Sequence, residues 1–288
     1  MQFGEEATFA GLNTQLAVMQ RYRETLDPHS EQQFKQQFQA QILPITMDSD
    51  FCRYFYDKPR GYAGDFLAME KIWLGRSQSD RYRYLGKNRL GQLVNAYTLD
   101  MSNCAANEYR VYYLKNRILS KPYKRIASIG CGSAIEIELA AKEVSLGAEV
   151  HLFDQDNGAL ETAAAKLRNL GCTPILYPGN IVRTLYKLDA DKFDLIYSSG
   201  MFDYFQDASA KKLIQKIWDL VLPDGTLIVT NANGLNPTKF WMEYVTEWYL
   251  EYKNTPGMLA LAGFSEEIRS IQFEKDPYGV YQYLNLTK

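Results

Sequence analysis

The sequence predicts an α/β fold, with a mostly parallel β-sheet that follows a helical N-terminal domain. From Ile126 onward, short β-branched and aromatic runs alternate with helical segments, which is typical of a doubly wound parallel sheet. Residues 1–118 show no such alternation, and runs such as Glu31–Phe38 carry apolar residues four apart. The expected domains are therefore 1–118, which is helical, and 119–288, which contains the sheet.

Within the sheet domain, five strands and three intervening helices are expected. Ser133 and Glu136 have the spacing of a capping box, which predicts that they start the first helix, and Gly147 is expected to end it after about Leu146. Gly171 and Pro223–Gly225 are the corresponding stop signals of the next two helices. The strands are expected at 125–130, 149–154, 173–178, 193–199 and 226–231, and the helices at about 133–146, 157–170 and 207–222.

The end of the chain breaks the alternation. Ser270–Glu274 and Val280–Leu286 have the pattern of strands, and the turn residues of Asp276–Gly279 lie between them. This arrangement predicts a terminal β-hairpin.

The first strand, its glycine turn and the second strand have the layout of a nucleoside-cofactor site. Gly130 and Gly132 allow the backbone to turn and to approach a ligand closely. Asp154 ends the second strand roughly 22 residues after Gly132, where a carboxylate can accept hydrogen bonds from ribose hydroxyls or can cap the next turn. Ala134 stands where a dinucleotide site has its third glycine, so these details favour S-adenosylmethionine. A glycine turn without any ligand is the structural alternative.

Composition narrows the class of function. The 288 residues are 46% hydrophobic and 23% charged, and a net charge of −2 gives no overall attraction to nucleic acid or to an anionic membrane. A small-molecule acceptor is therefore expected, with no nucleic acid and no membrane insertion. Arg81–Arg89 mixes basic and aromatic residues and could contact RNA, although a solvated helix face or a lid is the simpler interpretation.

The four cysteines lack C-x-x-C spacing and the only histidines are His29 and His151, so no metal site is expected. No signal peptide or long apolar run is recognisable. We therefore expect a cytoplasmic protein with reduced thiols.

Taken together, these features resemble the class I S-adenosylmethionine-dependent methyltransferases over about residues 120–288. The resemblance implies a Rossmann-like sheet of seven strands with an antiparallel last strand, and S-adenosyl-L-methionine as cofactor. The chain departs from that family at Ser128, where an acidic residue is usual, and at Ala134. The motifs that carry the resemblance are the glycine turn, Asp154, Gly179–Ile181, Phe193–Asp203 and Leu222–Ile228.

A narrower resemblance extends into the N-terminal domain. The chain is similar to bacterial methyltransferases related to the 3-hydroxypalmitate methyl ester synthase of quorum sensing. This similarity implies that the loop 60–65 closes over the cofactor, with Tyr62, Asp65 and Arg110 near it. It depends on four short segments, R-G-Y-A-G-D at 60–65, Asn107–Arg110, Gly200–Tyr204 and Glu247–Leu250.

The remaining cofactor contacts are expected at the ends of the third and fourth strands. Asn180 could contact adenine or could be a simple turn residue. The carbonyls of Ser199 and Gly200 could meet the methionine amine, or these residues could only form a tight turn. The full expected set is Tyr62, Asp65, Arg110, Gly130, Gly132, Asp154, Gln155, Asn180, Ile181, Ser199 and Gly200.

The expected chemistry needs mostly alignment and a dry pocket. An alcohol or phenol must lose a proton, usually to a histidine, but His29 and His151 are not well placed. A carboxylic acid is already ionised at neutral pH, so O-methylation of a carboxylic acid is favoured. Asp203, Tyr204 or Glu247 could act as a base, which leaves open an N- or phenol O-methyltransferase of a natural-product pathway. A non-catalytic cofactor-binding or scaffold protein also stays open.

Overall fold

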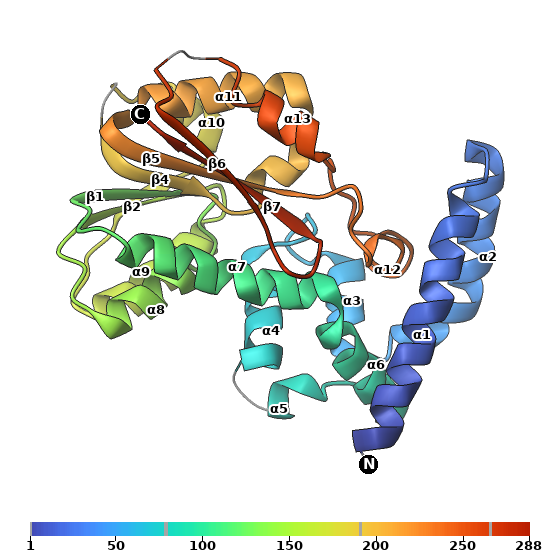
Figure 1. Cartoon of the computed structure of the whole chain (residues 1–288). Coiled ribbons are helices and arrows are strands. Elements are labelled where there is room, and N and C mark those ends of the chain that lie inside the picture. Colours follow the sequence, from blue (N-terminus) through green and yellow to red (C-terminus); the bar gives the residue numbers. More distant parts are fainter. Residues whose placement is uncertain (1, 78–79, 190–191, 265–266) are drawn as a thin grey trace. The chain divides into compact units, whose positions relative to one another are not determined.

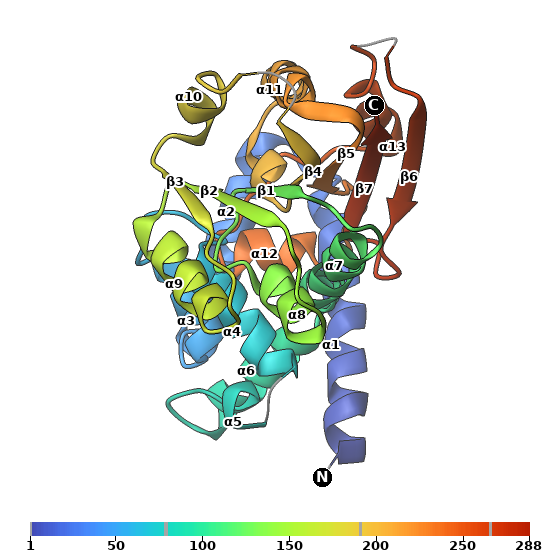
Figure 2. The same cartoon turned by 90° about the vertical axis from the view of Figure 1, so that its left-hand side faces the viewer.

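A computed structural model describes residues 2–77, 80–189, 192–264 and 267–288. The chain divides into two compact units, and each is described by itself (Figures 1 and 2). The helical unit comprises Met1–Glu108 and Leu235–Tyr249, and the sheet unit comprises Tyr109–Gly234 and Leu250–Lys288. The segment 235–249 follows a strand of the sheet, yet it belongs to the helical unit. The domain boundary predicted at 118 and 119 stays a prediction.

The helical unit has an aromatic core. Phe38 packs edge-on against Phe240 with ring centroids 5.0 Å apart, and Tyr97 packs edge-on against Trp241 at 5.4 Å. The predicted helical run 31–38 lies in α2, which Asp27 caps through the N–H groups of the first turn. The helices are α1 (Gln2–Arg23), α2 (Pro28–Thr46), α3 (Asp50–Asp57), α4 (Phe66–Ser77), α5 (Asp80–Arg83), α6 (Arg89–Asp100), the start of α7 (Ser102–Leu119) and α12 (Lys239–Tyr244).

The basic stretch 81–89 runs from α5 through the connection 84–88 to the first residue of α6. Arg83 donates to Asp100 at 2.7 Å, and Arg89 forms an ion pair with Glu5 at 3.1 Å. These two arginines therefore have acidic partners within the helical unit. This pairing favours the interpretation of the stretch as a solvated helix face.

Seven strands form one sheet within the described residues of the sheet unit, in the order β3-β2-β1-β4-β5-β7-β6 (Figure 1). The first five strands are parallel, whereas β7 pairs antiparallel with both β5 and β6. This topology confirms the predicted fold class and the terminal hairpin. The strands are β1 (Arg125–Ile129), β2 (Glu149–Asp154), β3 (Ile175–Pro178), β4 (Phe193–Ser198), β5 (Val221–Ala232), β6 (Ser270–Lys275) and β7 (Tyr281–Thr287).

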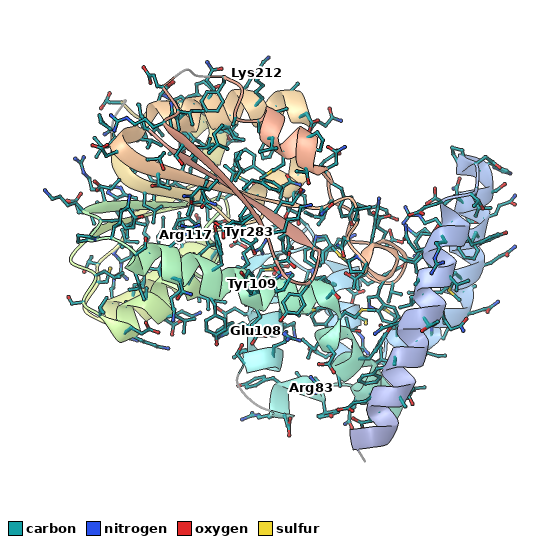
Figure 3. All side chains as sticks on the ribbon, in the orientation of Figure 1. Arg83, Glu108, Tyr109, Arg117, Lys212 and Tyr283 are labelled. Atoms are coloured by element: carbon teal, nitrogen blue, oxygen red, sulfur yellow. The ribbon has the colours of Figure 1, made fainter. Side chains whose placement is uncertain are left out.

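Helices cover both faces of the sheet. Ile214 and Trp218 of α11 (Asp207–Asp219) pack with Leu227 and Leu284 on one face. On the other face lie α7, α8 (Ile135–Glu143) and α9 (Asn157–Arg168) (Figure 2). Figure 3 labels Tyr109 on α7 and Tyr283 on β7, whose ring centroids are 6.3 Å apart. The remaining helices are α10 (Ile181–Leu185), η1 (Met201–Tyr204) and α13 (Thr255–Ala260).

The capping box predicted at Ser133 and Glu136 is wrong. Helix α8 begins at Ile135, and its N-cap residue Ala134 has a φ of 52° with no side-chain cap. Glu136 does not reach back to the N-cap, because its carboxylate instead accepts a hydrogen bond from the hydroxyl of Tyr197 at 2.7 Å.

All three predicted helices of the sheet unit end earlier than expected, and α9 ends at Arg168 rather than at about residue 170. Helix α8 ends at Glu143 rather than near Leu146, because Val144 already has an extended backbone. Helix α11 ends at Asp219, and Pro223–Gly225 does not stop the helix but lies inside β5. The pairing of β4 with β5 shifts register between Phe193 and Leu195, and this irregularity accommodates the earlier start of β5.

Measured by length and hydropathy, no helix in the described part of the chain qualifies as a membrane-spanning segment. Among the same residues, no three His, Cys, Asp or Glu side chains gather closely enough to hold a metal ion.

Candidate functional site

The glycine turn after β1 has a backbone that glycine adopts most readily. Gly130 and Gly132 have φ angles of 69° and 52°. The N–H groups of Gly130 and Cys131 both donate to the carbonyl of Phe153, at 2.8 and 3.0 Å. A Cβ on Gly130 would lie 3.3 Å from the Cβ of Met201. The turn is therefore tied to the end of β2 and packed closely against the segment after β4.

Asp154 holds this turn from the neighbouring strand. Its Oδ2 accepts from the N–H of Gly132 at 2.8 Å, and its Oδ1 accepts from the N–H of Asp156 at 2.9 Å. Burial raises the pKa of Asp154, although these backbone hydrogen bonds act in the opposite direction. The predicted capping role is therefore present. Each carboxylate oxygen keeps a second lone pair, which could accept a hydrogen bond from a ribose hydroxyl. The ribose contact by Asp154 and by the exposed Gln155 beside it stays a prediction.

The end of β3 lies beside the end of β2. The N–H of Gly179 donates to the carbonyl of Asp154 at 3.0 Å. The next residue, Asn180, is exposed, and its side chain caps α10 by accepting from the N–H of Arg183 at 2.9 Å. Ile181 packs against the apolar core on the α11 face. Asn180 is thus a turn and cap residue, and the adenine contact of Asn180 and Ile181 stays a prediction.

At the end of β4 the chain turns sharply at Gly200, which has a φ of 99°. Its N–H donates to Oγ1 of Thr230 at 3.1 Å, and Ser199 precedes it. The hydroxyl of Ser198 donates to the carbonyl of Ile129 at 3.0 Å and so connects the ends of β4 and β1. Ser198 and Thr230 were not singled out in the sequence, and their position at strand ends was the only available signal.

Arg110 lies next to this turn. Its guanidinium is 4.3 Å from the ring centroid of Tyr281, and the residue is only 7% exposed. A Cβ on Gly200 would lie 3.2 Å from Nη1 of Arg110 and 3.6 Å from Oδ2 of Asp203. Burial alone would lower the pKa of Arg110, but the electrostatic effects of Tyr281 and Asp203 raise it overall. The structure therefore brings a charged arginine to the end of β4.

Asp203 is the acidic member of this group. It is buried, and its Oδ1 accepts from the N–H of Ala232 at 2.6 Å. Burial raises the pKa of Asp203 to about 6, even though the charge of Arg110 acts to lower it. The next residue, Tyr204, is 46% exposed. Among the residues proposed as bases, Asp203 thus has its pKa raised toward neutral pH.

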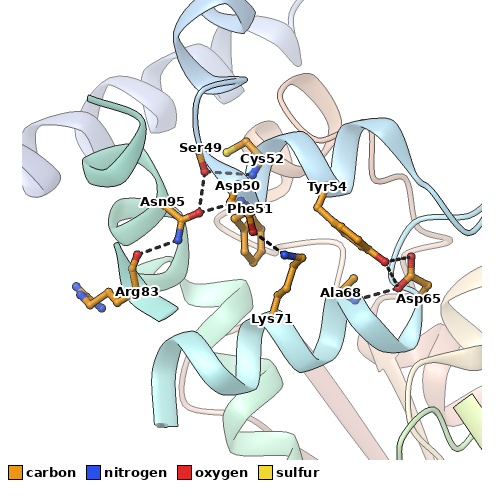
Figure 4. Close-up of polar contacts among 10 residues, drawn as sticks. All are labelled: Ser49, Asp50, Phe51, Cys52, Tyr54, Asp65, Ala68, Lys71, Arg83 and Asn95. Carbon is orange, nitrogen blue, oxygen red and sulfur yellow. Dashed lines mark hydrogen bonds and ion pairs between the residues drawn. The ribbon is translucent and has the colours of Figure 1, made fainter. Parts of the chain in front are cut away.

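Asp65 organises the N-terminal loop of the helical unit. Its Oδ1 accepts from the N–H of Ala68 at 2.9 Å, and the hydroxyl of Tyr54 lies 3.1 and 3.2 Å from its two oxygens (Figure 4). Asp65 therefore fixes the start of α4. The preceding loop has the unusual backbone that the sequence predicts, with φ angles of 88° at Gly61 and 73° at Gly64. Tyr62 lies between these two glycines.

Glu247 is the third candidate base, and it also belongs to the helical unit. Its Oε1 lies 2.6 Å from both Nζ of Lys35 and Nε2 of Gln39. Burial alone would raise the pKa of Glu247, but these two hydrogen bonds outweigh it and hold the pKa below its usual value. A low pKa makes a carboxylate a weaker base. The roles of Tyr62, Asp65 and Glu247 at the cofactor or in catalysis stay predictions.

Comparison with known proteins gives matches of two kinds. Residues 126–225 match a family model described as a methyltransferase domain. No curated protein gives a significant match. Among solved structures, a possible exported protein from Bordetella parapertussis is 17% identical with a TM-score of 0.58, over 83% of this chain and 94% of that one.

Two further structures carry methyltransferase names. The S-adenosylmethionine-dependent methyltransferase SibL is 12% identical with a TM-score of 0.51, over 88% of this chain and 72% of that one. The magnesium protoporphyrin IX methyltransferase of Synechocystis, solved with S-adenosylmethionine bound, is 14% identical with a TM-score of 0.49, over 78% and 98%.

The segment matched by the family model contains the glycine turn, Asp154 and the turn after β4. These residues fit an adenosyl cofactor for two reasons. Hydrogen bonds hold the glycine turn and the strand ends together, and the Asp154 carboxylate can still accept further hydrogen bonds. The sheet order places them at neighbouring strand ends, where such folds bind ligands. Residues 126–225 are therefore similar to a methyltransferase domain, and the seven-stranded sheet has the class I methyltransferase fold.

Proposed function

We propose that the protein transfers the methyl group of S-adenosylmethionine to the carboxylate of a small-molecule acid, and that the helical unit shapes the acceptor pocket. The main support is the position of both histidines. His151 lies in the middle of β2, where its Nδ1 is 3.1 Å from the hydroxyl of Tyr177 and burial lowers its pKa. His29 lies in the first turn of α2 in the helical unit. His151 therefore does not stand at a strand end, and His29 belongs to the other unit.

The acidic residues support the same acceptor. Asp203 has one oxygen engaged with the backbone of Ala232, and Glu247 is paired with Lys35 and Gln39. A free carboxylic acid has a pKa near 4, so at neutral pH it needs no base before it attacks the methyl group. Candidate bases that are held by structural partners are less available to accept a proton. An acceptor that is already ionised does not need them.

When bound, S-adenosylmethionine supplies a methyl group on a positively charged sulfur. In the proposed arrangement, Asp154 accepts hydrogen bonds from the ribose, and the glycine turn admits the adenosyl part close to the backbone. The carbonyls of Ser199 and Gly200 accept from the methionine amine. These residues bind and align, which is most of what a displacement reaction requires.

The segments shared with the 3-hydroxypalmitate methyl ester synthase group also support an acid acceptor. In this proposal, Tyr62, Asp65 and Arg110 lie near the cofactor, as that resemblance implies. Asp65 fixes the loop that contains Tyr62, and Gly200 leaves room for Arg110.

A second candidate is O-methylation of a phenol. It is favoured by Asp203, because a carboxylate with a pKa of about 6 is matched to proton abstraction near neutral pH. In that case Asp203 accepts the phenolic proton while the phenolate attacks the methyl group.

One experiment separates these candidates. The protein is incubated with S-adenosylmethionine and a panel of carboxylic acids, phenols and amines, and the products are identified by mass spectrometry. We expect a gain of one methyl group on acids only, and no product from the Asp154→Ala variant. Methylation confined to phenols or amines would overturn the preferred candidate. A protein that binds the cofactor but methylates nothing in the panel would support a non-catalytic role.

A further inference from the structure

Thr230 is a fully buried threonine near the end of β5, and the proposed mechanism does not use it. The parallel pairing of β4 with β5 ends at Ser198 and Val229, whereas β5 itself continues to Ala232. Thr230 is therefore the first residue of β5 beyond this pairing. Its hydroxyl lies beside the turn at which the chain leaves β4.

The hydroxyl of Thr230 bonds to the backbone on both sides of Ser199. It accepts from the N–H of Gly200 at 3.1 Å and donates to the carbonyl of Ser198 at 3.4 Å. A hydroxyl has one hydrogen to donate and two lone pairs that accept, so both bonds can form at once. The side chain of Thr230 thus holds the peptide that joins Ser199 to Gly200.

This contact sets the direction of the Ser199 carbonyl. The peptide in question is trans, and a planar trans peptide directs its C=O and its N–H to opposite sides. Because the N–H of Gly200 points to Thr230 on β5, the carbonyl of Ser199 points away from β5. Strand β4 lies between β5 and β1, and the glycine turn follows β1. The carbonyl is therefore directed to the side of β4 that borders this turn.

Gly200 would also permit the opposite orientation of the same peptide. Its φ is 99°, and turning the peptide over would bring φ to about −80°, which glycine adopts about as readily. The next peptide is fixed separately, because the N–H of Asp203 donates to the carbonyl of Gly200 at 3.3 Å. The hydroxyl of Thr230 therefore selects one of two orientations that the glycine backbone leaves open.

We propose that Thr230 is a positioning residue for the cofactor, whose hydroxyl keeps the Ser199 carbonyl turned toward the methionine amine of S-adenosylmethionine. This inference rests on the proposed function, in which that carbonyl accepts from the amine. Thr230 acts through the peptide and touches neither the cofactor nor the acceptor. Loss of its hydroxyl should therefore weaken the binding of the amino-acid part of the cofactor and spare the adenosyl part. A hydrogen bond from a charged amine is stronger than one from a neutral donor, so the effect should be measurable.

The test is calorimetric titration of the full chain with two ligands. S-adenosylhomocysteine carries the amine, whereas methylthioadenosine keeps the adenosine and the sulfur but lacks the amino-acid part. Thr230→Val replaces the hydroxyl by a methyl group and keeps the branched shape of the side chain. We expect this variant to lose about tenfold in affinity for S-adenosylhomocysteine and to bind methylthioadenosine within about twofold of the unaltered protein.

Two further variants serve as controls. Thr230→Ser keeps the hydroxyl and loses only the methyl group, so it should restore the affinity ratio of the unaltered protein. Thr98→Val makes the same chemical change as Thr230→Val in the helical unit, where the fully buried Thr98 donates to the carbonyl of Val94 at 2.8 Å. The ratio should stay unchanged in Thr98→Val. An equal shift in both valine variants would show general destabilisation and would contradict the positioning role.

A readout in the unaltered protein makes the test independent of folding defects. Ser199–Gly200 is the one Ser-Gly pair in the sequence, so labelling serine at its carbonyl carbon and glycine at its nitrogen gives one NMR signal for this peptide. Saturation with S-adenosylhomocysteine should shift the carbonyl resonance more than saturation with methylthioadenosine, because only the former brings an amine to it.

Two results would overturn the inference. One is an unchanged affinity ratio in Thr230→Val, and the other is an equal response of the Ser199 carbonyl to both ligands. Failure of the unaltered protein to bind either compound would instead overturn the proposed function.

Discussion

The carboxylate of Asp154, at the end of β2, accepts a hydrogen bond from the backbone N–H of Gly132 at 2.8 Å. Two neighbouring strand ends are thereby joined by one side chain, and the same carboxylate also holds the N–H of Asp156. The residue proposed to bind a ribose is therefore also the residue that shapes the glycine turn.

Asp154→Ala should abolish cofactor binding and also destabilise the fold. Removing the acceptor leaves the N–H groups of Gly132 and Asp156 without their partner, which costs about 1–3 kcal/mol. Asp154→Asn keeps an amide oxygen as acceptor and should lose less stability, but it should still bind the cofactor more weakly. Titration calorimetry and urea unfolding measure the two effects separately. Unchanged cofactor affinity in Asp154→Ala would remove the ribose role.

Asp203 should make the stability of the protein depend on pH. Its pKa is about 6 in the folded protein and 3.8 for an ordinary aspartate. The folded state therefore binds the proton more tightly than the unfolded state. This contribution to stability is fully present below pH 3.8 and is lost as the pH rises through 6.

The corresponding experiment compares the unaltered protein with Asp203→Asn, whose amide oxygen can still accept from Ala232. Relative to the unaltered protein, the variant should gain up to about 3 kcal/mol of unfolding free energy between pH 4 and pH 7. Urea denaturation at each pH gives this difference, in which the contributions of other titrating groups largely cancel. A difference that stays constant over this range would contradict the assigned pKa.

Glu247→Gln should leave methyl transfer within about twofold of the unaltered rate, because a carboxylate whose pKa is held low is a weak proton acceptor. The variant should lose about 1 kcal/mol of stability through its weakened contact with Lys35. Lys35→Met, which removes the other partner, serves as the comparison for stability. A hundredfold fall in kcat in Glu247→Gln alone would make Glu247 a base after all.

The strands β1, β2 and β4 could be read from sequence because each is short, largely apolar and followed by turn residues. The run Glu149–Asp154 matches β2 to the residue. The start of α8 could not be read in the same way. Ser133 and Glu136 have the spacing of a cap, but tertiary contact with Tyr197 draws Glu136 away from that role. Local spacing does not record such long-range partners.

The same limit applies to the site. The carboxyl ends of parallel strands meet at one edge of a sheet, so the proximity of Asp154 to the glycine turn followed from the strand order alone. Arg110 lies on a helix outside the alternating region, and only a family resemblance drew attention to it. Its burial against Tyr281 joins residues that lie far apart in the sequence, and no motif predicts such a contact.

Gly200 provides the last test, because it separates backbone strain from crowding. Gly200→Ala places a methyl group 3.2 Å from Nη1 of Arg110 in a backbone with a φ of 99°. Gly171→Ala, after α9, introduces comparable strain at a φ of 75°, but its Cβ meets no atom within 4 Å. Both variants should lose about 1–2 kcal/mol of stability from the left-handed backbone.

Only Gly200→Ala should also weaken S-adenosylmethionine binding, by about tenfold or more, because it displaces Arg110 from the end of β4. Thermal unfolding together with calorimetry distinguishes the two losses. If Gly171→Ala weakened binding equally, the effect would reflect general destabilisation. A guanidinium displaced next to the methionine part of the cofactor must change the affinity for the cofactor. If Gly200→Ala bound the cofactor normally, Arg110 and the turn after β4 would therefore lie outside the cofactor site.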